Sequence, residues 1–241
     1  MRTGFSPGLI SPVRRWPGTW PPARRSSSDN GVVDDWVELR TGVRPTPPPA
    51  VRRSTRSVLD PETRPSGAEP DPSVTFGPRG RAVANHLLEV HGHHRAEIDH
   101  VRDVVGQVRA GVAAIGAARS AVNDMAVRAN SWTLGGICQA QCLALTQHHT
   151  METGQVFPHL VAEQPDLAPV VERLDAEHHL IHGVLEELDA ALVHLVQHPS
   201  DLDPLEAALD LLEDTLLSHF AYEERELVAP LARHGFFLDQ V

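Results

Sequence analysis

Beyond residue 80, apolar residues recur every three or four positions, the spacing that places them on one face of a helix. No stretch there alternates between apolar and polar residues as a half-buried strand does. We therefore predict an all-α fold, an antiparallel up-and-down four-helix bundle, in which Gly111 ends the first helix. The four predicted helices are about Arg81–Val108, Thr133–Glu163, Leu167–His198, and a last one from a cap at Ser200 or Asp201 to about His234.

The first 76 residues lack this periodicity. They contain SPVRRWPGTWPPARRSSSDNG and VRPTPPPAVRRSTR, which are rich in Pro, Arg and Ser and poor in aliphatic residues. Such segments bury too little apolar surface to offset the entropy lost on ordering them. We predict a disordered extension over residues 1–76 and a helical domain over residues 80–235. Deletion of residues 1 to about 75 is expected to leave helicity and metal content unchanged.

Charge is distributed unevenly within the total of −11. Residues 1–75 hold 11 Arg against 8 acidic residues, a net of +3, whereas residues 76–241 hold 10 Arg against 24 acidic residues. Because the basic excess is small and interrupted by acids, we expect neither nucleic acid nor membrane as a partner. No run approaches the roughly 18 apolar residues of a membrane span. Two cysteines fit a reducing compartment, so we predict a cytoplasmic protein.

Polar residues interrupt the apolar stripe of every predicted helix. An unpaired carboxylate is costly to bury, and this chain has no lysine and few arginines on these stripes to neutralise one. A metal cation would supply the missing positive charge. The interrupting residues are His91 in the first helix, His148 and Glu152 in the second, His178 and His182 in the third, and His219 and Glu223 in the fourth.

The spacing of these residues fits two metal ions. Positions i and i+4 project from the same side of a helix, so each His-x-x-x-Glu or His-x-x-x-His pair can hold one ion with two ligands. Five imidazoles and two carboxylates exceed the needs of a single ion, and this donor mixture suits iron. On the fourth helix, Glu223 is rotated about 40° from His219 and Glu224 about 140°. We therefore favour Glu223 as the bridging ligand and Glu224 as a supporting acid.

Four segments resemble the four helices of the hemerythrin-like, or HHE cation-binding, family, in order: EVHGHHRAEID, TQHHTMETGQVFPHL, LDAEHHLIHGVLEEL and LLSHFAYEERELVAPL. The resemblance covers roughly residues 80–235. It implies a bundle that holds two iron ions, bridged by two carboxylates and an oxygen, with dioxygen bound at one open iron. By position, the resemblance makes ligands of His91, His148, Glu152, His178, His182 and His219, and of either Glu223 or Glu224.

The remaining polar residues are assigned lesser roles. His149 and His179 are expected off the ligand face, and His94 is an alternative to His91. Thr153 stands where the family often has a second acid, and Cys138 and Cys142 are expected as reduced core residues.

The resemblance and the ligand set together predict a protein that binds dioxygen reversibly or senses oxygen or iron, rather than an enzyme. Its expected partner is dioxygen, or a similar small diatomic or peroxide ligand. Two alternatives stand beside this prediction. One is a di-iron enzyme that consumes peroxide or nitric oxide, and the other is a metal-gated interaction module.

Overall fold

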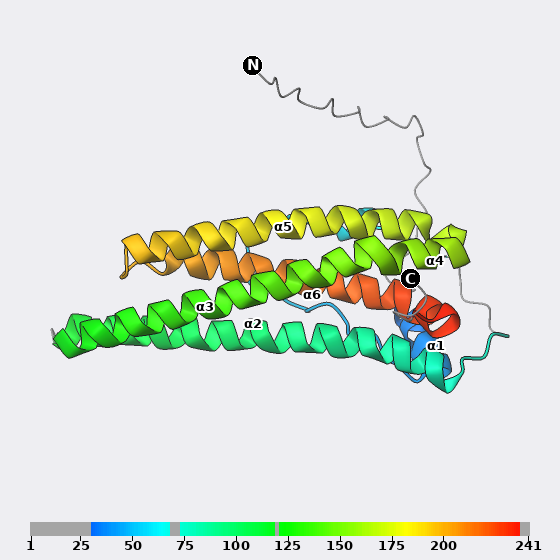
Figure 1. The fold of residues 1–241 in the computed structure, drawn as a ribbon, viewed down its shortest axis with the longest axis horizontal. Coiled ribbons are helices and arrows are strands. Elements are labelled where there is room, and N and C mark those ends of the chain that lie inside the picture. The colour runs from blue at the N-terminus through cyan, green and yellow to red at the C-terminus, as the bar shows by residue number, and fades with distance from the viewer. Residues whose placement is uncertain (1–29, 68–72, 119–120, 237–241) are drawn as a thin grey trace, which may run out of the picture.

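The computed structural model describes residues 30–67, 73–118 and 121–236 of the chain. All regular secondary structure in these ranges is helical, and the long helices lie side by side along one axis (Figure 1). Helix α6 packs against both α2 and α5, and α2 packs against α3. The elements are α1 (Asn30–Thr41), η1 (Pro61–Thr63), α2 (Pro78–Ala118), α3 (Ala121–Met151), η2 (Glu152–Val156), α4 (Phe157–Glu163), η3 (Pro165–Leu167), α5 (Ala168–Gln197) and α6 (Asp203–His234).

The predicted break in the first helix does not occur, because α2 continues through Gly111 to Ala118. A glycine inside a helix costs only about 1 kcal/mol. That cost is small beside the gain from burying residues such as Val105 and Val108 on the same helix. Helix α3 correspondingly begins at Ala121, earlier than predicted, whereas α5 and α6 lie within a few residues of their predicted ranges.

The second long helical run is interrupted by one wide turn, η2, which links α3 to α4. There the Phe157 amide donates to the Glu152 carbonyl, five residues back instead of four. Pro158 has no N–H with which to continue the regular ladder, so it favours an irregular turn just before it. Turns of this kind are frequent at functional sites. This one begins at Glu152, a predicted metal ligand.

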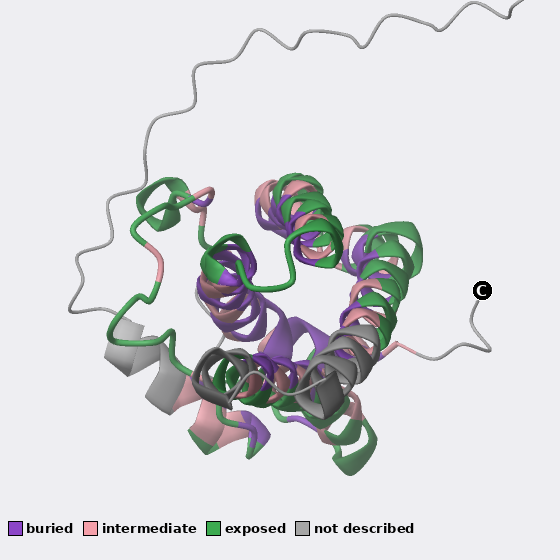
Figure 2. Cartoon of the chain, turned by 90° about the vertical axis from the view of Figure 1, so that its left-hand side faces the viewer, coloured by how far each residue is buried: buried purple, intermediate pink, exposed green. Residues whose placement is uncertain are grey.

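The interior consists of two apolar clusters with a polar layer between them. Each long helical run contributes to both clusters, and the predicted ligands lie close to the point at which its contribution changes from one cluster to the other. Figure 2, which looks along the bundle, shows buried residues on the inward faces of the helices. One cluster includes Ile98, Leu145, Ile181 and Leu216, and the other includes Ala84, Leu160, Leu174 and Leu227.

Residues 30–67 form an N-terminal arm, made of α1 and an irregular segment, that lies against α6. The arm buries Val37, Val43 and Leu59. Its backbone is also tied to α6, because the Ser54 amide donates to Asp214 Oδ2 at 2.7 Å. The prediction of a disordered extension therefore does not hold for this segment.

The reason for that error is physical. The arm gains order from hydrogen bonds between its backbone or arginines and carboxylates that are about 160 positions away in sequence. Long-range contacts of this kind leave no periodic apolar pattern in the arm itself. The prediction of disorder also covers residues 1–29 and 68–72, which lie outside the described part of the chain. Among the described helices, none combines the length and apolar character needed to cross a membrane.

Candidate metal centre

The polar layer contains two groups of potential metal ligands, and every member is buried. Within each group, one nitrogen or oxygen from every residue lies within 4.8 Å of those from the others. We call the first group the four-residue cluster and the second the three-histidine cluster. The four-residue cluster is His91, His148, Glu152 and Glu223, and the three-histidine cluster is His149, His178 and His219.

Both carboxylates of the four-residue cluster also approach the three-histidine cluster. Glu152 Oε1 is 3.2 Å from His148 Nε2, and its Oε2 is 3.6 Å from His178 Nε2. Glu223 Oε2 is 3.4 Å from His91 Nε2 and 3.5 Å from His219 Nε2. Each carboxylate thus approaches one histidine of the four-residue cluster and one histidine of the three-histidine cluster. This is the position that a ligand shared between two cations would need.

The inward-facing atoms of both clusters lack hydrogen-bond partners within the described residues. An unsatisfied buried polar group costs about 1–3 kcal/mol, so a concentration of them in one layer indicates a missing partner. A cation bound to these lone pairs would satisfy them, so the residues present fit a metal. The unpartnered atoms include Nε2 of His91, His148, His149, His178 and His219, Glu152 Oε2 and both carboxylate oxygens of Glu223.

Protonation in this layer also favours a cation. Burial, followed by the positive charge of neighbouring imidazoles, lowers the pKa of His178 to about 3 and lowers that of His148 strongly. These rings are therefore neutral at physiological pH, the form that binds metals. Burial and the nearby Glu223 raise the pKa of Glu152 well above its usual value. A cation between the two carboxylates would remove this conflict and let both ionise.

Two further carboxylates orient cluster histidines from outside the clusters. His219 Nδ1 donates to Glu177 Oε2 at 3.1 Å, and His91 Nδ1 donates to Glu224 Oε1 at 2.9 Å. Because ionised carboxylates only accept hydrogen bonds, these contacts place the ring proton on Nδ1 and leave the Nε2 lone pair facing the site. Hydrogen bonds from His219 and Arg64 outweigh the effect of burial and lower the pKa of Glu177 to about 2.

Thr153 gives His178 the same kind of support. Its hydroxyl donates to Asp175 Oδ1 at 2.9 Å and accepts from His178 Nδ1 at 3.0 Å. Because the hydroxyl proton is directed to Asp175, the ring proton of His178 lies on Nδ1. A hydroxyl linked to an acid of α5 therefore orients this ring, from the position at which the resemblance leads us to expect an acid.

His182 is not brought into either cluster. Its side chain is 63% exposed, and its Nε2 lies 3.6 Å from Glu186 Oε1 on the surface. The buried stripe of α5 is centred near Ile181, with His178 at one margin. Four further residues add a rotation of about 40° in the same direction, and this rotation carries His182 out of the core.

His149 completes the three-histidine cluster, although the sequence reasoning placed it off the ligand face. Glu152 lies four residues after His148 and three after His149, so on a helix the two rings flank it by about 40° and 60°. Both rings therefore reach the interior beside the carboxylate. The signal that could have identified His149 is this second spacing, three residues before a buried acid.

Other predicted candidates lie around the clusters. Glu224 belongs to neither group, and its buried carboxylate accepts from His91, Arg95 and the Thr46 amide. His94 is buried but lies outside both clusters, with its Nδ1 3.4 Å from Gln141 Nε2.

Cys138 and Cys142 do not contribute ligands to either cluster. Both are free thiols, and burial raises the pKa of Cys138 to about 12. A thiol with so high a pKa is an unreactive core side chain rather than a thiolate ligand.

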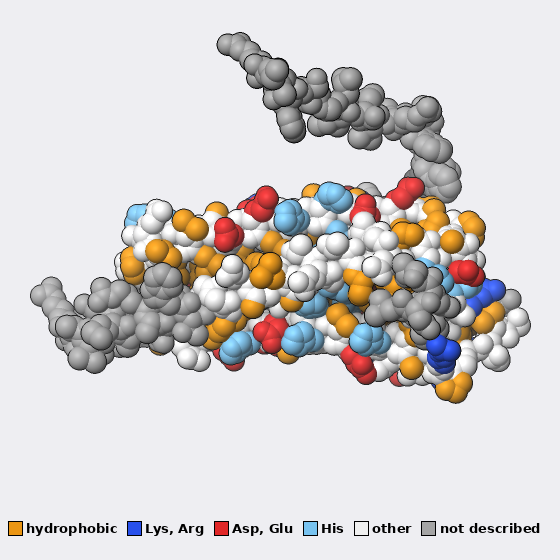
Figure 3. Space-filling view, viewed as in Figure 1, with side chains coloured by type: hydrophobic (Ala, Val, Ile, Leu, Met, Phe, Trp, Pro, Cys, Tyr) orange, Lys and Arg blue, Asp and Glu red, His pale blue; other side chains and the backbone are white. Residues whose placement is uncertain are grey.

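A surface groove of about 450 Å³ opens between α5 and the end of α3 with the η2 turn. His149 and His178 lie in its inner wall, whereas His179 and His182 lie at its exposed rim. Figure 3, which views the molecule from the side on which α3 and α5 are seen in Figure 1, shows histidine side chains at this surface. The cluster residues that line this groove, His149 and His178, both belong to the three-histidine cluster.

Comparison with known families agrees with this geometry. A profile described as the Hemerythrin HHE cation binding domain matches residues 82–231. The match spans all seven cluster residues and begins after the N-terminal arm. No curated protein and no solved structure matches the chain significantly.

Proposed function

Because this chain belongs to the hemerythrin HHE cation binding domain family, we propose that it is a non-haem di-iron protein that binds dioxygen reversibly. Reversible binding of this kind serves either as oxygen carriage or as the input of an oxygen or iron sensor. We also propose that the four long helical runs form the up-and-down bundle usual for such a centre. The alternating direction of successive runs in Figure 1 supports this topology.

The approach of Glu152 and Glu223 to histidines of both clusters is the observation that carries the proposal. Each carboxylate lies within 3.6 Å of a histidine nitrogen of either cluster. Mixed imidazole and carboxylate donors, without thiolate, suit iron better than softer metals. One ion would be held by the four-residue cluster and a second by the three-histidine cluster, with both acids shared.

The chemistry supplied by the iron pair, when bound, is the two electrons that dioxygen accepts. The chain contributes a donor set dominated by neutral imidazoles, which limits the electron density at the centre and so favours binding over cleavage of the O–O bond. It also excludes bulk water. Phe220 stacks on the His91 ring at a centroid distance of 4.1 Å, and Phe157 stacks on His178 at 5.5 Å.

We place the open position at the three-histidine cluster. This cluster has three imidazoles of its own, and His149 and His178 line the groove. A small ligand that enters between α3 and α5 would meet this end of the centre first. The four-residue cluster is covered by Phe220 on one side and by the supporting acid Glu224 on the other.

One observation favours the enzyme alternative. The groove, at about 450 Å³, is larger than a dioxygen molecule needs, and its rim carries the exposed imidazoles of His179 and His182. Exposed imidazoles near a reactive metal can relay protons, which the consumption of peroxide or nitric oxide requires. Sustained turnover of peroxide or nitric oxide would distinguish this enzyme from a protein that only binds dioxygen.

The deciding experiment starts from iron-loaded, anaerobically reduced protein. We expect two bound irons per chain and uptake of one dioxygen per iron pair with a new visible absorption band. Deoxygenation should remove the bound dioxygen and the band. Sustained consumption of peroxide or nitric oxide would move the enzyme to first place. A chain that binds no iron would contradict both candidates.

A further inference from the structure

The N-terminal arm lies outside the match to the family, yet it reaches the metal centre. Residues 30–67 precede the matched range of 82–231. Two groups of this arm hydrogen-bond the two carboxylates, Glu177 and Glu224, that orient ligand histidines. Both carboxylates are buried, so they depend on nearby protein groups, and not on water, for their remaining hydrogen bonds.

The first link runs from Arg64 through Glu177 to His219. Arg64 Nε and Nη2 donate to the two oxygens of Glu177 at 2.8 and 2.9 Å, a two-point contact that fixes the plane of the carboxylate. The same carboxylate accepts from His219 Nδ1 at 3.1 Å. Arg64 is itself held, because its Nη1 donates to the Ser218 carbonyl and its guanidinium lies 4.7 Å from the centre of the Tyr222 ring.

The second link runs from the Thr46 amide through Glu224 to His91. The amide donates to Glu224 Oε2 at 2.6 Å, and the other oxygen accepts from His91 Nδ1 at 2.9 Å. Thr46 lies between Pro45 and Pro47, two residues that fix an extended backbone. The amide is therefore directed at the carboxylate by a stiff segment of the arm.

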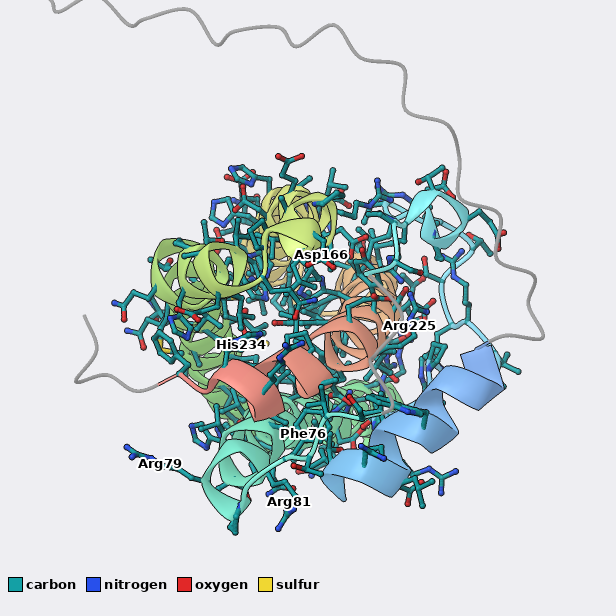
Figure 4. The ribbon with its side chains drawn as sticks, turned by 90° about the vertical axis from the view of Figure 1, so that its right-hand side faces the viewer. Phe76, Arg79, Arg81, Asp166, Arg225 and His234 are labelled. Carbon is teal, nitrogen blue, oxygen red and sulfur yellow. The ribbon has the colours of Figure 1, made fainter. Side chains whose placement is uncertain are left out.

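The arm remains attached to α6 beyond these two links. Tyr222 donates its hydroxyl proton to the Pro65 carbonyl at 2.8 Å, and the Gly67 amide donates to Glu226 Oε2 at 2.8 Å. Figure 4, an end view, shows the irregular part of the arm on the side of α6 where Arg225 is labelled. The attachment therefore continues along the helix that carries His219, Glu223 and Glu224.

We propose that the N-terminal arm is a working part of the metal centre, in which Arg64 and the Thr46 amide are positioning groups for His219 and His91. The inference rests on the proposed metal-binding function. Each link acts through one carboxylate on one ligand of a different cluster, so the arm braces both ends of the centre. Arg173 also donates to Glu177, and Arg95 also donates to Glu224, so loss of a link from the arm leaves each carboxylate with fewer donors. The carboxylate is then held less firmly, and so is the metal-facing orientation of the imidazole that it holds.

The arm also provides a matched control for this proposal. Arg56 makes a two-point ion pair with Glu187 at 2.7 and 3.1 Å, as Arg64 does with Glu177, but this pair is exposed and has no link to a ligand. Arg64→Ala and Arg56→Ala therefore remove the same charge from the same arm. Only the first removes a support of the centre.

The experiment uses the full chain and Co²⁺ as the probe, because its visible spectrum reports the ligand geometry. We expect Arg64→Ala to weaken Co²⁺ binding about 10- to 100-fold and to alter the spectrum of the bound ion. Arg56→Ala should match the parent in both readouts. Arg64→Lys, which keeps the charge without the two-point contact, should recover part of the affinity.

A second pair of variants keeps the test decisive if Arg64→Ala does not fold. Thr46→Pro removes the amide donor together with the threonine side chain, in a segment already shaped by prolines, whereas Thr46→Ala removes the side chain beyond Cβ and keeps the amide. We expect weaker Co²⁺ binding and a changed spectrum for Thr46→Pro alone. Unchanged affinity and spectrum in Thr46→Pro, or in a folded Arg64→Ala, would overturn the proposal. Absence of metal binding by the parent chain would instead refute the proposed function.

Discussion

The two clusters of the polar layer differ in how they are enclosed. The four-residue cluster holds both carboxylates and is sealed by Phe220 and by the acid Glu224 behind His91. The three-histidine cluster has only imidazoles of its own, and two of them line a surface groove. This difference is the one that our proposal requires, in which a closed position retains a metal and an open position exchanges small ligands.

Glu152 and Glu223 each approach a histidine of both clusters, so loss of either carboxylate should have the largest effect. We expect Glu223→Ala to lose at least one of the two irons and to lower the melting temperature of the iron-loaded protein towards that of the stripped protein. The reason is that Glu223 Oε2 lies 3.4 Å from His91 and 3.5 Å from His219. Iron analysis and calorimetry measure the two effects.

Glu224→Gln is the matched control, since it changes an adjacent buried acid that lies outside both clusters. It should retain both irons with reduced affinity. Full iron content in Glu223→Ala, combined with loss of iron in Glu224→Gln, would transfer the bridging role to Glu224.

The next largest effect should come from His149, which we assign in place of His182 as the third imidazole of the three-histidine cluster. We expect His149→Ala to lose the iron of the three-histidine cluster, together with the absorption band produced by azide, because His149 lies in the inner wall of the groove. His182→Ala should keep both, since that side chain is exposed. Loss of the azide band in His182→Ala with retention in His149→Ala would reverse the assignment.

The support of His178 gives a smaller effect. Thr153→Val keeps the shape of the side chain but removes the hydroxyl between His178 and Asp175. We expect metal affinity at the open cluster to fall about tenfold, the lower end of the range for such supporting groups. Thr150→Val is the control, because its hydroxyl donates only to the Thr146 carbonyl. Equal affinities in a metal titration of the two variants would exclude a role for Thr153.

The smallest expected effect concerns access. Gly154 lines the groove and has open space around it, so Gly154→Leu should partly fill the groove without displacing a ligand. Stopped-flow measurements should show azide binding slowed several-fold at unchanged iron content. Gly136→Leu, at another open position on the surface of α3, should bind azide at the parent rate. Equal rates in both variants would mean that ligands reach the centre by another route.

Residue periodicity was sufficient to predict the all-helical class and six of the seven cluster residues. Periodicity does not decide which residues are buried near the edge of a helix's buried face. His182 shares the i+4 spacing of His178, but a drift of about 40° places it on the surface. The four-residue spacing from His148 to Glu152 does not indicate His149, which lies three residues before the same acid. Which of two spacings reaches the interior depends on how each helix is rotated against its neighbours, and that is a property of tertiary contacts.

The N-terminal arm was not predictable from local pattern. Its order depends on partners that are remote in sequence, such as Glu177 for Arg64 and Glu224 for Thr46. The same contacts explain why Glu224 is buried although it points about 140° away from His219 around α6. A segment without an apolar period can still be ordered when a neighbouring helix presents buried carboxylates to its amides and arginines.

The difference between the two metal positions can be measured directly by Mössbauer spectroscopy of the reduced, iron-loaded protein before and after addition of azide. Two unequal iron sites should give two quadrupole doublets of equal area. Azide should shift strongly the doublet of the three-histidine cluster, the one that is lost in His149→Ala, and leave the other nearly unchanged. A single doublet, or two doublets that respond equally to azide, would contradict the assignment of one closed and one open position.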